Sequence, residues 1–341
     1  MEDPSVIRTG EAPLLSPDPV KKAKRDYRRI GFALCVFIGA ASALQIAAQT
    51  ILSIVCPAVT EQGWYIWVLS FIPLYLFGFP LSLLLFFSVP AERPEKKTIP
   101  FYEWLAVLTV SIFLMYAGNL IGNLVNLVIS QLFGAEAVTV VNMLDGSQLY
   151  FSAPAVVIVA PVMEELICRK LLLDRTRRYG EAAAAVFSAV SFGLIHGNFT
   201  QFFYAFALGM VFSWVYLRTG RVIYTMLLHA SINFLGGVIG PLILSKVDPD
   251  ALSTDDPEAL VSYLMSGGLR ELLPVFFYVG VLFSLALVGA ILLLVFRKKI
   301  VFLPASEELP RQKVFSVVYL NAGTILFVVF CLGLFVLAFF Q

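Results

Sequence analysis

The chain contains repeated runs of apolar residues, each about as long as a helix needs to be to cross a lipid bilayer. A helix rises ~1.5 Å per residue, so about 20 residues span the ~30 Å hydrocarbon core. Hydrophobic residues make up 59% of the 341 residues and charged residues 14%, whereas a soluble domain carries roughly 25% charged residues. We therefore expect an all-α, polytopic membrane protein.

Nine transmembrane helices are predicted, at about 30–56, 64–88, 101–133, 148–173, 182–197, 199–217, 222–244, 272–296 and 314–340. The first apolar run is too long for the apolar part of a signal peptide, so we expect it to remain in the protein. The predicted organisation is a polar cytoplasmic tail (1–29), two N-terminal transmembrane helices (30–100), a core (101–244), an acidic outer loop (245–271) and two C-terminal transmembrane helices (272–341).

The basic residues predict the orientation of the chain, because short cytoplasmic loops accumulate Lys and Arg. With the N terminus placed in the cytoplasm, all but two of the 24 basic residues fall in inner segments, and only Lys246 and Arg270 lie outside. These residues are spread along the chain, and the net charge is only +1. This pattern does not indicate a nucleic-acid-binding surface.

Two adjacent carboxylates, Glu164 and Glu165, occur within the fourth apolar run. A charge at the bilayer centre costs roughly 2.5–3.5 kcal/mol, so such a pair indicates a site inside the membrane. Adjacent residues of a helix point about 100° apart, which suggests different roles. Glu165 precedes Arg169 by four residues, the spacing of an ion pair along one helix face. Glu164 has no such local cation and is the better candidate for a general base.

The only two histidines of the chain, His196 and His229, lie in two other apolar runs. Counting from the cytoplasmic edges of the spans places Glu164 and both histidines roughly 12–15 Å deep, near the midplane. Gly180 is a plausible hairpin tip, because Glu164 and His196 are equally distant from it in the sequence. We expect these three side chains to meet at one level of the membrane.

Three short motifs follow one another: EExxxR (Glu164, Glu165, Arg169), FxxxH (Phe192, His196) and HxxxN (His229, Asn233). In this order they resemble the motif set of the CPBP intramembrane metalloprotease family. That family groups CAAX-prenyl endopeptidases of the Ras-converting type with bacteriocin-processing and bacteriocin-immunity (Abi) proteins. The close resemblance covers Glu164 to Asn233, within a CPBP-like core of 101–244. Each motif is weak alone, but three in order that use both histidines are a specific signal.

The resemblance implies an intramembrane endopeptidase in which Glu164 and His196 activate a water molecule. His229 and Asn233 would then stabilise the oxyanion that forms on the attacked carbonyl. The supporting residues would be Glu165, Arg169 and Phe192. General chemistry agrees with these roles, because hydrolysis without a covalent intermediate needs a base for water and donors aimed at the tetrahedral oxygen.

Other interpretations of the same residues remain open at this stage. Two histidines and a carboxylate can hold zinc with one position left for water, although the chain has no HExxH motif. We expect no cofactor and retain a zinc-dependent protease as an alternative. A non-cleaving membrane scaffold or bacteriocin self-immunity protein of the same fold is another. A transporter is disfavoured, because the sequence shows no inverted repeat.

The expected partners are a hydrophobic or lipidated peptide substrate and membrane lipids. The expected location is a multi-pass position in a bacterial cell membrane. The sequence leaves the substrate and the cleavage position undetermined.

Overall fold

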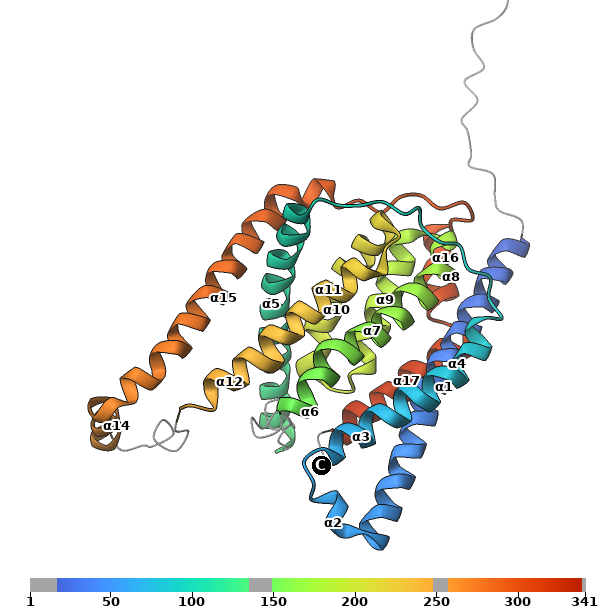
Figure 1. Cartoon of the computed structure of the whole chain (residues 1–341). Helices are drawn as coiled ribbons and strands as arrows, with labels where there is room; N and C mark the ends of the chain where they lie inside the picture. Colours follow the sequence, from blue (N-terminus) through green and yellow to red (C-terminus); the bar gives the residue numbers. More distant parts are fainter. Residues whose placement is uncertain (1–16, 135–148, 248–256, 339–341) are drawn as a thin grey trace, which may run out of the picture.

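The computed structural model describes residues 17–134, 149–247 and 257–338, which form an all-helical bundle without strands in these ranges (Figure 1). Seven helical segments in these ranges are long and apolar enough to cross a membrane. They are Pro19–Val55, Tyr65–Phe86, Phe101–Phe133, Leu149–Tyr179, Phe199–Thr219, Val222–Leu244 and Val261–Lys299. The predicted class, an all-α polytopic membrane protein, is confirmed.

Two of the nine predicted spans take other forms. The segment predicted at 182–197 is helix α9 (Glu181–Ile195), which has only 15 residues. The segment predicted at 314–340 consists of α16 (Arg311–Val318) and α17 (Ala322–Leu337), which are bent by 62° relative to each other. The described residues thus support seven spans, or eight if the bent pair is one span. The predicted total of nine is not confirmed.

The first half of the chain supplies the N-terminal helices and α5. In order they are α1 (Pro17–Val55), α2 (Pro57–Thr60), α3 (Tyr65–Phe71), η1 (Ile72–Gly78), α4 (Phe79–Phe86) and α5 (Phe101–Phe133). The η1 segment is π-helical, and Pro73 lies at its start. Proline has no backbone N–H and interrupts the regular hydrogen-bond ladder, which accounts for a local change of helix type there.

The central segment runs through α6 (Leu149–Pro154), η4 (Ala155–Val159), α7 (Ala160–Glu165), η5 (Leu166–Leu173), α8 (Asp174–Thr176) and η6 (Arg177–Tyr179). It turns at Gly180, whose φ of +127° favours glycine, so the predicted hairpin tip is confirmed. After α9 come α10 (Phe199–Thr219), α11 (Val222–Phe234), η7 (Leu235–Ile239) and α12 (Gly240–Leu244).

The last part of the chain consists of α14 (Pro257–Tyr263), η8 (Leu264–Gly268), α15 (Leu269–Phe296), η9 (Arg297–Lys299), α16 and α17. The structure differs from the predicted outer loop, 245–271. Residues 257–271 are helical, and the candidate membrane span already begins at Val261. The helical chain has a kink within this stretch, at Gly267, whose φ is +126°. Some predicted segments lie partly outside the described residues: 1–16 of the tail, 135–148 of the core, 248–256 of the loop and 339–340 of the last span.

The helices that carry the three motifs occupy the middle of the bundle. Helices α7, α9, α10 and α11 lie between α1, α3, α4 and α17 on one side and α5 and α15 on the other (Figure 1). Close helix approach holds these flanks together. The backbone of α1 at Gly31 contacts that of α17 at Gly323, and Gly118 and Gly122 of α5 lie directly against α10. A Cβ atom at any of these glycines would overlap the neighbouring backbone.

The basic segments gather at one end of the bundle, the upper end in Figure 1. The connection between α4 and α5 is hydrogen-bonded there to the turns that end the central helices, from Glu92 N to Asp174 O (2.5 Å) and from Lys97 N to Thr219 O (2.8 Å). Near the start of α1, Lys22 forms an ion pair with Glu307 of the α15–α16 connection at 2.9 Å. These segments therefore lie at one end of the bundle, and the distribution of basic residues predicts that this end is cytoplasmic.

The orientation can be measured with single-cysteine variants, because Glu61 and Lys97 are exposed at opposite ends of the bundle. In a background that lacks the exposed Cys56, we expect Glu61→Cys to react with a membrane-impermeant maleimide in intact cells. Lys97→Cys should react only after permeabilisation. The reverse pattern would place the N terminus outside.

Candidate active site

A buried ion pair lies at the centre of the site. Arg169 Nε lies 3.0 Å from Glu165 Oε2, and Arg169 Nη2 donates a hydrogen bond to Glu165 Oε1 at 3.4 Å. Both side chains are fully buried. Arg169 also donates to the Ser188 hydroxyl of α9 at 2.7 Å, and its guanidinium lies over the rings of Phe192 and Phe212. The predicted pairing of Glu165 with Arg169 is thus observed, and it connects η5 with α9 and α10.

His229 of α11 lies between the two adjacent glutamates. Its Nδ1 is 3.3 Å from Glu165 Oε1, within hydrogen-bond distance, and its Nε2 is 3.8 Å from Glu164 Oε2. The side chain is 6% exposed, and its ring packs edge-on against Phe192 with the centroids 5.5 Å apart. Glu165 therefore fixes the orientation of the imidazole, and the opposite ring nitrogen faces Glu164.

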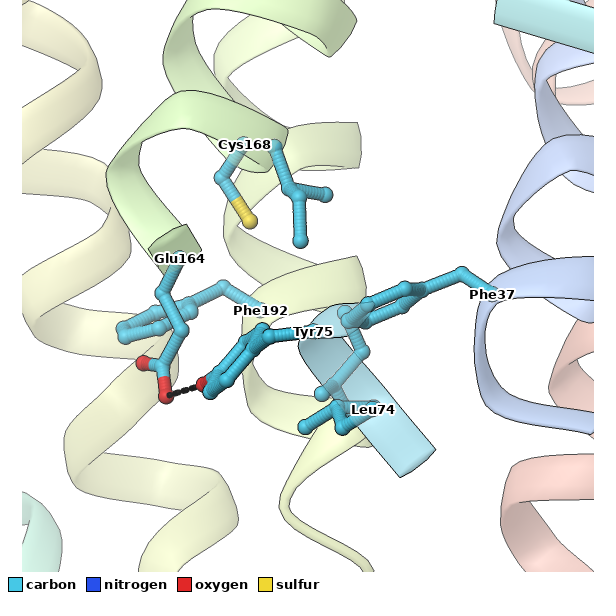
Figure 2. A pocket seen from close by; sticks show the side chains of 8 residues that line it. Phe37, Leu74, Tyr75, Glu164, Cys168 and Phe192 are labelled. Carbon is cyan, nitrogen blue, oxygen red and sulfur yellow. Dashed lines mark hydrogen bonds between the residues drawn. The ribbon is translucent and has the colours of Figure 1, made fainter. Parts of the chain in front are cut away.

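Glu164 is the less enclosed of the two carboxylates, with 19% of its side chain exposed. Its Oε1 accepts a hydrogen bond from the hydroxyl of Tyr75 at 3.3 Å, as Figure 2 shows. Its Oε2 is buried and has no hydrogen-bond partner among the described residues. Because a buried acceptor without a partner is costly, this oxygen is suited to bind a water molecule or a substrate donor.

His196 caps the C-terminal end of α9. Its Nδ1 lies 2.7 Å from the carbonyl oxygen of Phe192, and its ring packs edge-on against the Phe192 ring at 5.0 Å between centroids. A proton on Nδ1 would be donated to that carbonyl, which leaves Nε2 with a free lone pair. The other neighbour of the Phe192 ring is the His229 ring, so both imidazoles contact the same phenylalanine.

Asn233 lies one turn beyond His229 on α11. Its Nδ2 donates to the backbone carbonyl oxygen of Val156 at 2.9 Å, which connects α11 to η4. Among the described residues, no hydrogen bond joins Asn233 to Glu164 or His196. The structure thus gathers Glu164, His196 and His229, whereas the amide of Asn233 is engaged with a neighbouring helix.

A small cavity of about 20 Å³ adjoins Glu164, which is room for about one water molecule. Its lining comes from α1, η1, the α7–η5 segment and α9. Apart from Glu164, the Tyr75 hydroxyl and the Cys168 thiol, the lining side chains are apolar (Figure 2). The lining residues are Phe37, Leu74, Tyr75, Glu164, Ile167, Cys168, Phe192 and Ile195. Glu164 thus contributes to the wall of a largely apolar space of about the size of one water molecule.

The arrangement does not fit a zinc centre. In the described parts of the chain, no three side chains of His, Cys, Asp or Glu are placed to hold a metal ion. Protein zinc sites use at least three such ligands at about 2.0–2.3 Å. Glu164 and His229 approach each other, at 3.8 Å between Oε2 and Nε2, but no third ligand of these types joins them among the described residues.

Three residues of this arrangement were not predicted from the sequence: Tyr75, Ser188 and Phe212. Tyr75 is a polar side chain in the middle of an apolar run, and Ser188 lies one helical turn before Phe192. In the sequence these positions give only a weak signal of a role in the site. None of the three residues belongs to a motif, and each contacts a partner on another helix.

Comparison with known families supports the interpretation of the motifs. Residues 146–235 match the family model described as type II CAAX prenyl endopeptidase, Rce1-like. This segment contains all three motifs, and the match confirms the resemblance to CAAX-type intramembrane proteases and supports a peptidase function. No curated protein and no solved structure matches the chain. The helices outside this segment carry no family assignment.

The buried ion pair makes a prediction about stability. Removing one partner leaves the other charge unpaired in an apolar interior, which typically costs about 3–5 kcal/mol. We therefore expect Arg169→Met to lower the thermal unfolding midpoint of detergent-solubilised protein substantially. Lys22→Met is the control, because the Lys22–Glu307 pair is 39% and 32% exposed and contributes at most about 1 kcal/mol. Equal midpoints for the two variants would contradict this account of the pair.

Proposed function

We propose that this integral, multi-pass membrane protein is an endopeptidase that hydrolyses a peptide bond within the membrane by means of a water molecule activated by Glu164. One observation carries the proposal. Glu164 is partly buried, has a buried oxygen without a hydrogen-bond partner and adjoins a water-sized cavity, and both histidine rings pack against Phe192, which also lines this cavity. The segment that contains these residues matches a CAAX-protease family model.

In the proposed reaction, Glu164 accepts a proton from water while the water oxygen bonds to the peptide carbonyl carbon. His196 assists through Nε2, because Nδ1 faces the Phe192 carbonyl. The proton is then delivered to the amide nitrogen as the C–N bond breaks. The chain uses no covalent intermediate, so it needs no nucleophilic side chain.

The negative charge on the carbonyl oxygen requires donors in the tetrahedral intermediate. His229 supplies one in its doubly protonated form, in which Nε2, the nitrogen that faces Glu164, donates to the oxyanion and Nδ1 donates to Glu165. The ion pair with Arg169 in turn fixes Glu165. Asn233 would serve as a second donor with its remaining amide proton, since the other is donated to Val156.

The proposed substrate is a membrane-associated or lipidated peptide, because the surroundings of Glu164 are apolar. Entry is expected from the cytoplasmic side, where the basic ends of the central helices lie. We expect the protein to act in a bacterial cell membrane, where bacteriocin precursors and other short hydrophobic peptides are candidate substrates.

The engagement of Asn233 favours one alternative. Its amide donates to the Val156 carbonyl oxygen and so supports helix packing instead of facing Glu164. This arrangement would suit a protein that keeps the fold but does not hydrolyse peptides. The second candidate function is therefore a non-cleaving scaffold or bacteriocin self-immunity protein. The two functions differ in whether peptide fragments depend on Glu164.

Replacement of the proposed base tests the function directly. Glu164→Gln is nearly isosteric, keeps an acceptor for Tyr75 and removes the basic carboxylate. We expect peptide release to fall at least about 100-fold, the lower range for general acid–base catalysis. Peptides from cells with equal membrane levels of each protein are compared by mass spectrometry. Glu61→Gln, a change at an exposed position, is the matched control. Wild-type release by Glu164→Gln would favour the non-cleaving function.

Metal dependence has a separate test, because the described side chains offer no three-ligand site. The purified protein should hydrolyse the identified substrate at an unchanged rate after dialysis against a zinc chelator. A loss of rate that added zinc restores, with no effect of magnesium, would instead assign a metal to the mechanism.

A further inference from the structure

Tyr75 reaches the proposed base from a part of the chain outside the matched family segment. It belongs to η1, whereas the match covers residues 146–235. Its side chain is 7% exposed, and its hydroxyl donates to Glu164 Oε1 at 3.3 Å (Figure 2). The N-terminal helices therefore contribute a polar contact to the site as well as apolar packing.

The position of Tyr75 is set by close packing of η1 on α1. Gly78, in the same π-helical segment, lies so near the carbonyl oxygen of Phe37 that a Cβ atom there would overlap it. The Tyr75 ring also packs edge-on against Phe71, with the centroids 5.3 Å apart. Phe37 and Tyr75 then form one wall of the cavity beside Glu164. The hydroxyl is thus held on a rigid support.

The hydrogen bond distinguishes the two oxygens of Glu164. A glutamate carboxylate rotates over a broad range about its terminal torsion, so its two oxygens interchange unless a neighbour fixes one of them. Tyr75 binds Oε1, and Oε2 stays without a partner, 3.8 Å from His229 Nε2. Without the Tyr75 hydroxyl, the carboxylate of Glu164 could rotate, and Oε2 would no longer be held on the side of His229.

We infer that Tyr75 is a positioning residue whose hydroxyl fixes Glu164 Oε1, so that Oε2 is the oxygen that takes the proton from water. This inference rests on the proposed function. It also means that the catalytic arrangement is completed by the N-terminal helices, which lie outside the matched segment. A protein reduced to the matched segment would lack this contact.

The test is Tyr75→Phe, which removes the hydroxyl and keeps the ring. We expect kcat to fall about tenfold, the effect of losing one hydrogen bond to a charged group, with KM unchanged. Tyr65→Phe is the matched control. Tyr65 lies on the same span, is also 7% exposed, and its buried hydroxyl has no hydrogen-bond partner among the described residues.

The comparison of wild-type protein with Glu164→Gln comes first, because equal rates would reject the proposed function itself. If these two differ, a kcat of Tyr75→Phe equal to that of Tyr65→Phe overturns the inference alone. A raised KM with unchanged kcat also overturns it, since Tyr75 would then contact the substrate. Thermal unfolding of both variants is measured in parallel. If Tyr75→Phe alone unfolds, the hydroxyl is structural and the inference fails.

Discussion

The buried ion pair between Glu165 and Arg169 is the interaction on which the site depends. A single unpaired charge in the apolar interior is energetically costly. Each charged side chain of the pair can therefore be buried only because the other compensates its charge. Their contacts then extend outward: Arg169 binds Ser188 and lies between two aromatic rings, and Glu165 holds His229. Three helices are therefore aligned by a single charge pair. The neighbouring Glu164 differs, because no arginine or lysine pairs with it among the described residues and its Oε1 binds a tyrosine hydroxyl.

Changes of helix type recur next to the site residues. Tyr75 lies within the π-helical η1, the two glutamates lie between η4 and η5, and η7 begins two residues after Asn233. A π-helical turn widens the backbone and shifts the side chains that follow it, and such turns are frequent at functional sites. In this protein, π-helical turns thus lie in or beside the stretches of three spans that carry Tyr75, Glu164 and Asn233.

The sequence predicts what depends on local spacing. The four-residue interval from Glu165 to Arg169 specifies an ion pair on one face, and the turn at Gly180 brings α9 back beside the glutamates. Counting residues through the spans anticipates that His229 lies beside Glu164. Contacts between distant helices have no comparable signal. The Tyr75–Glu164 bond joins residues 89 apart, and neither local pattern nor hydrophobicity specifies it. The number of spans also escapes prediction, because a hydropathy pattern does not reveal a bend such as that between α16 and α17.

The packing of the first helix against the last has a consequence for biosynthesis. Lys22 and Glu307 are 285 residues apart in the chain, and Gly31 contacts Gly323 at the same interface. At about 5–20 residues per second, a ribosome needs roughly 15–60 s to complete that interval. During this time α1 is already in the bilayer, and the face that will receive α17 is covered by lipid or by another membrane protein. The interface between α1 and α17 therefore forms only after α17 has been synthesised.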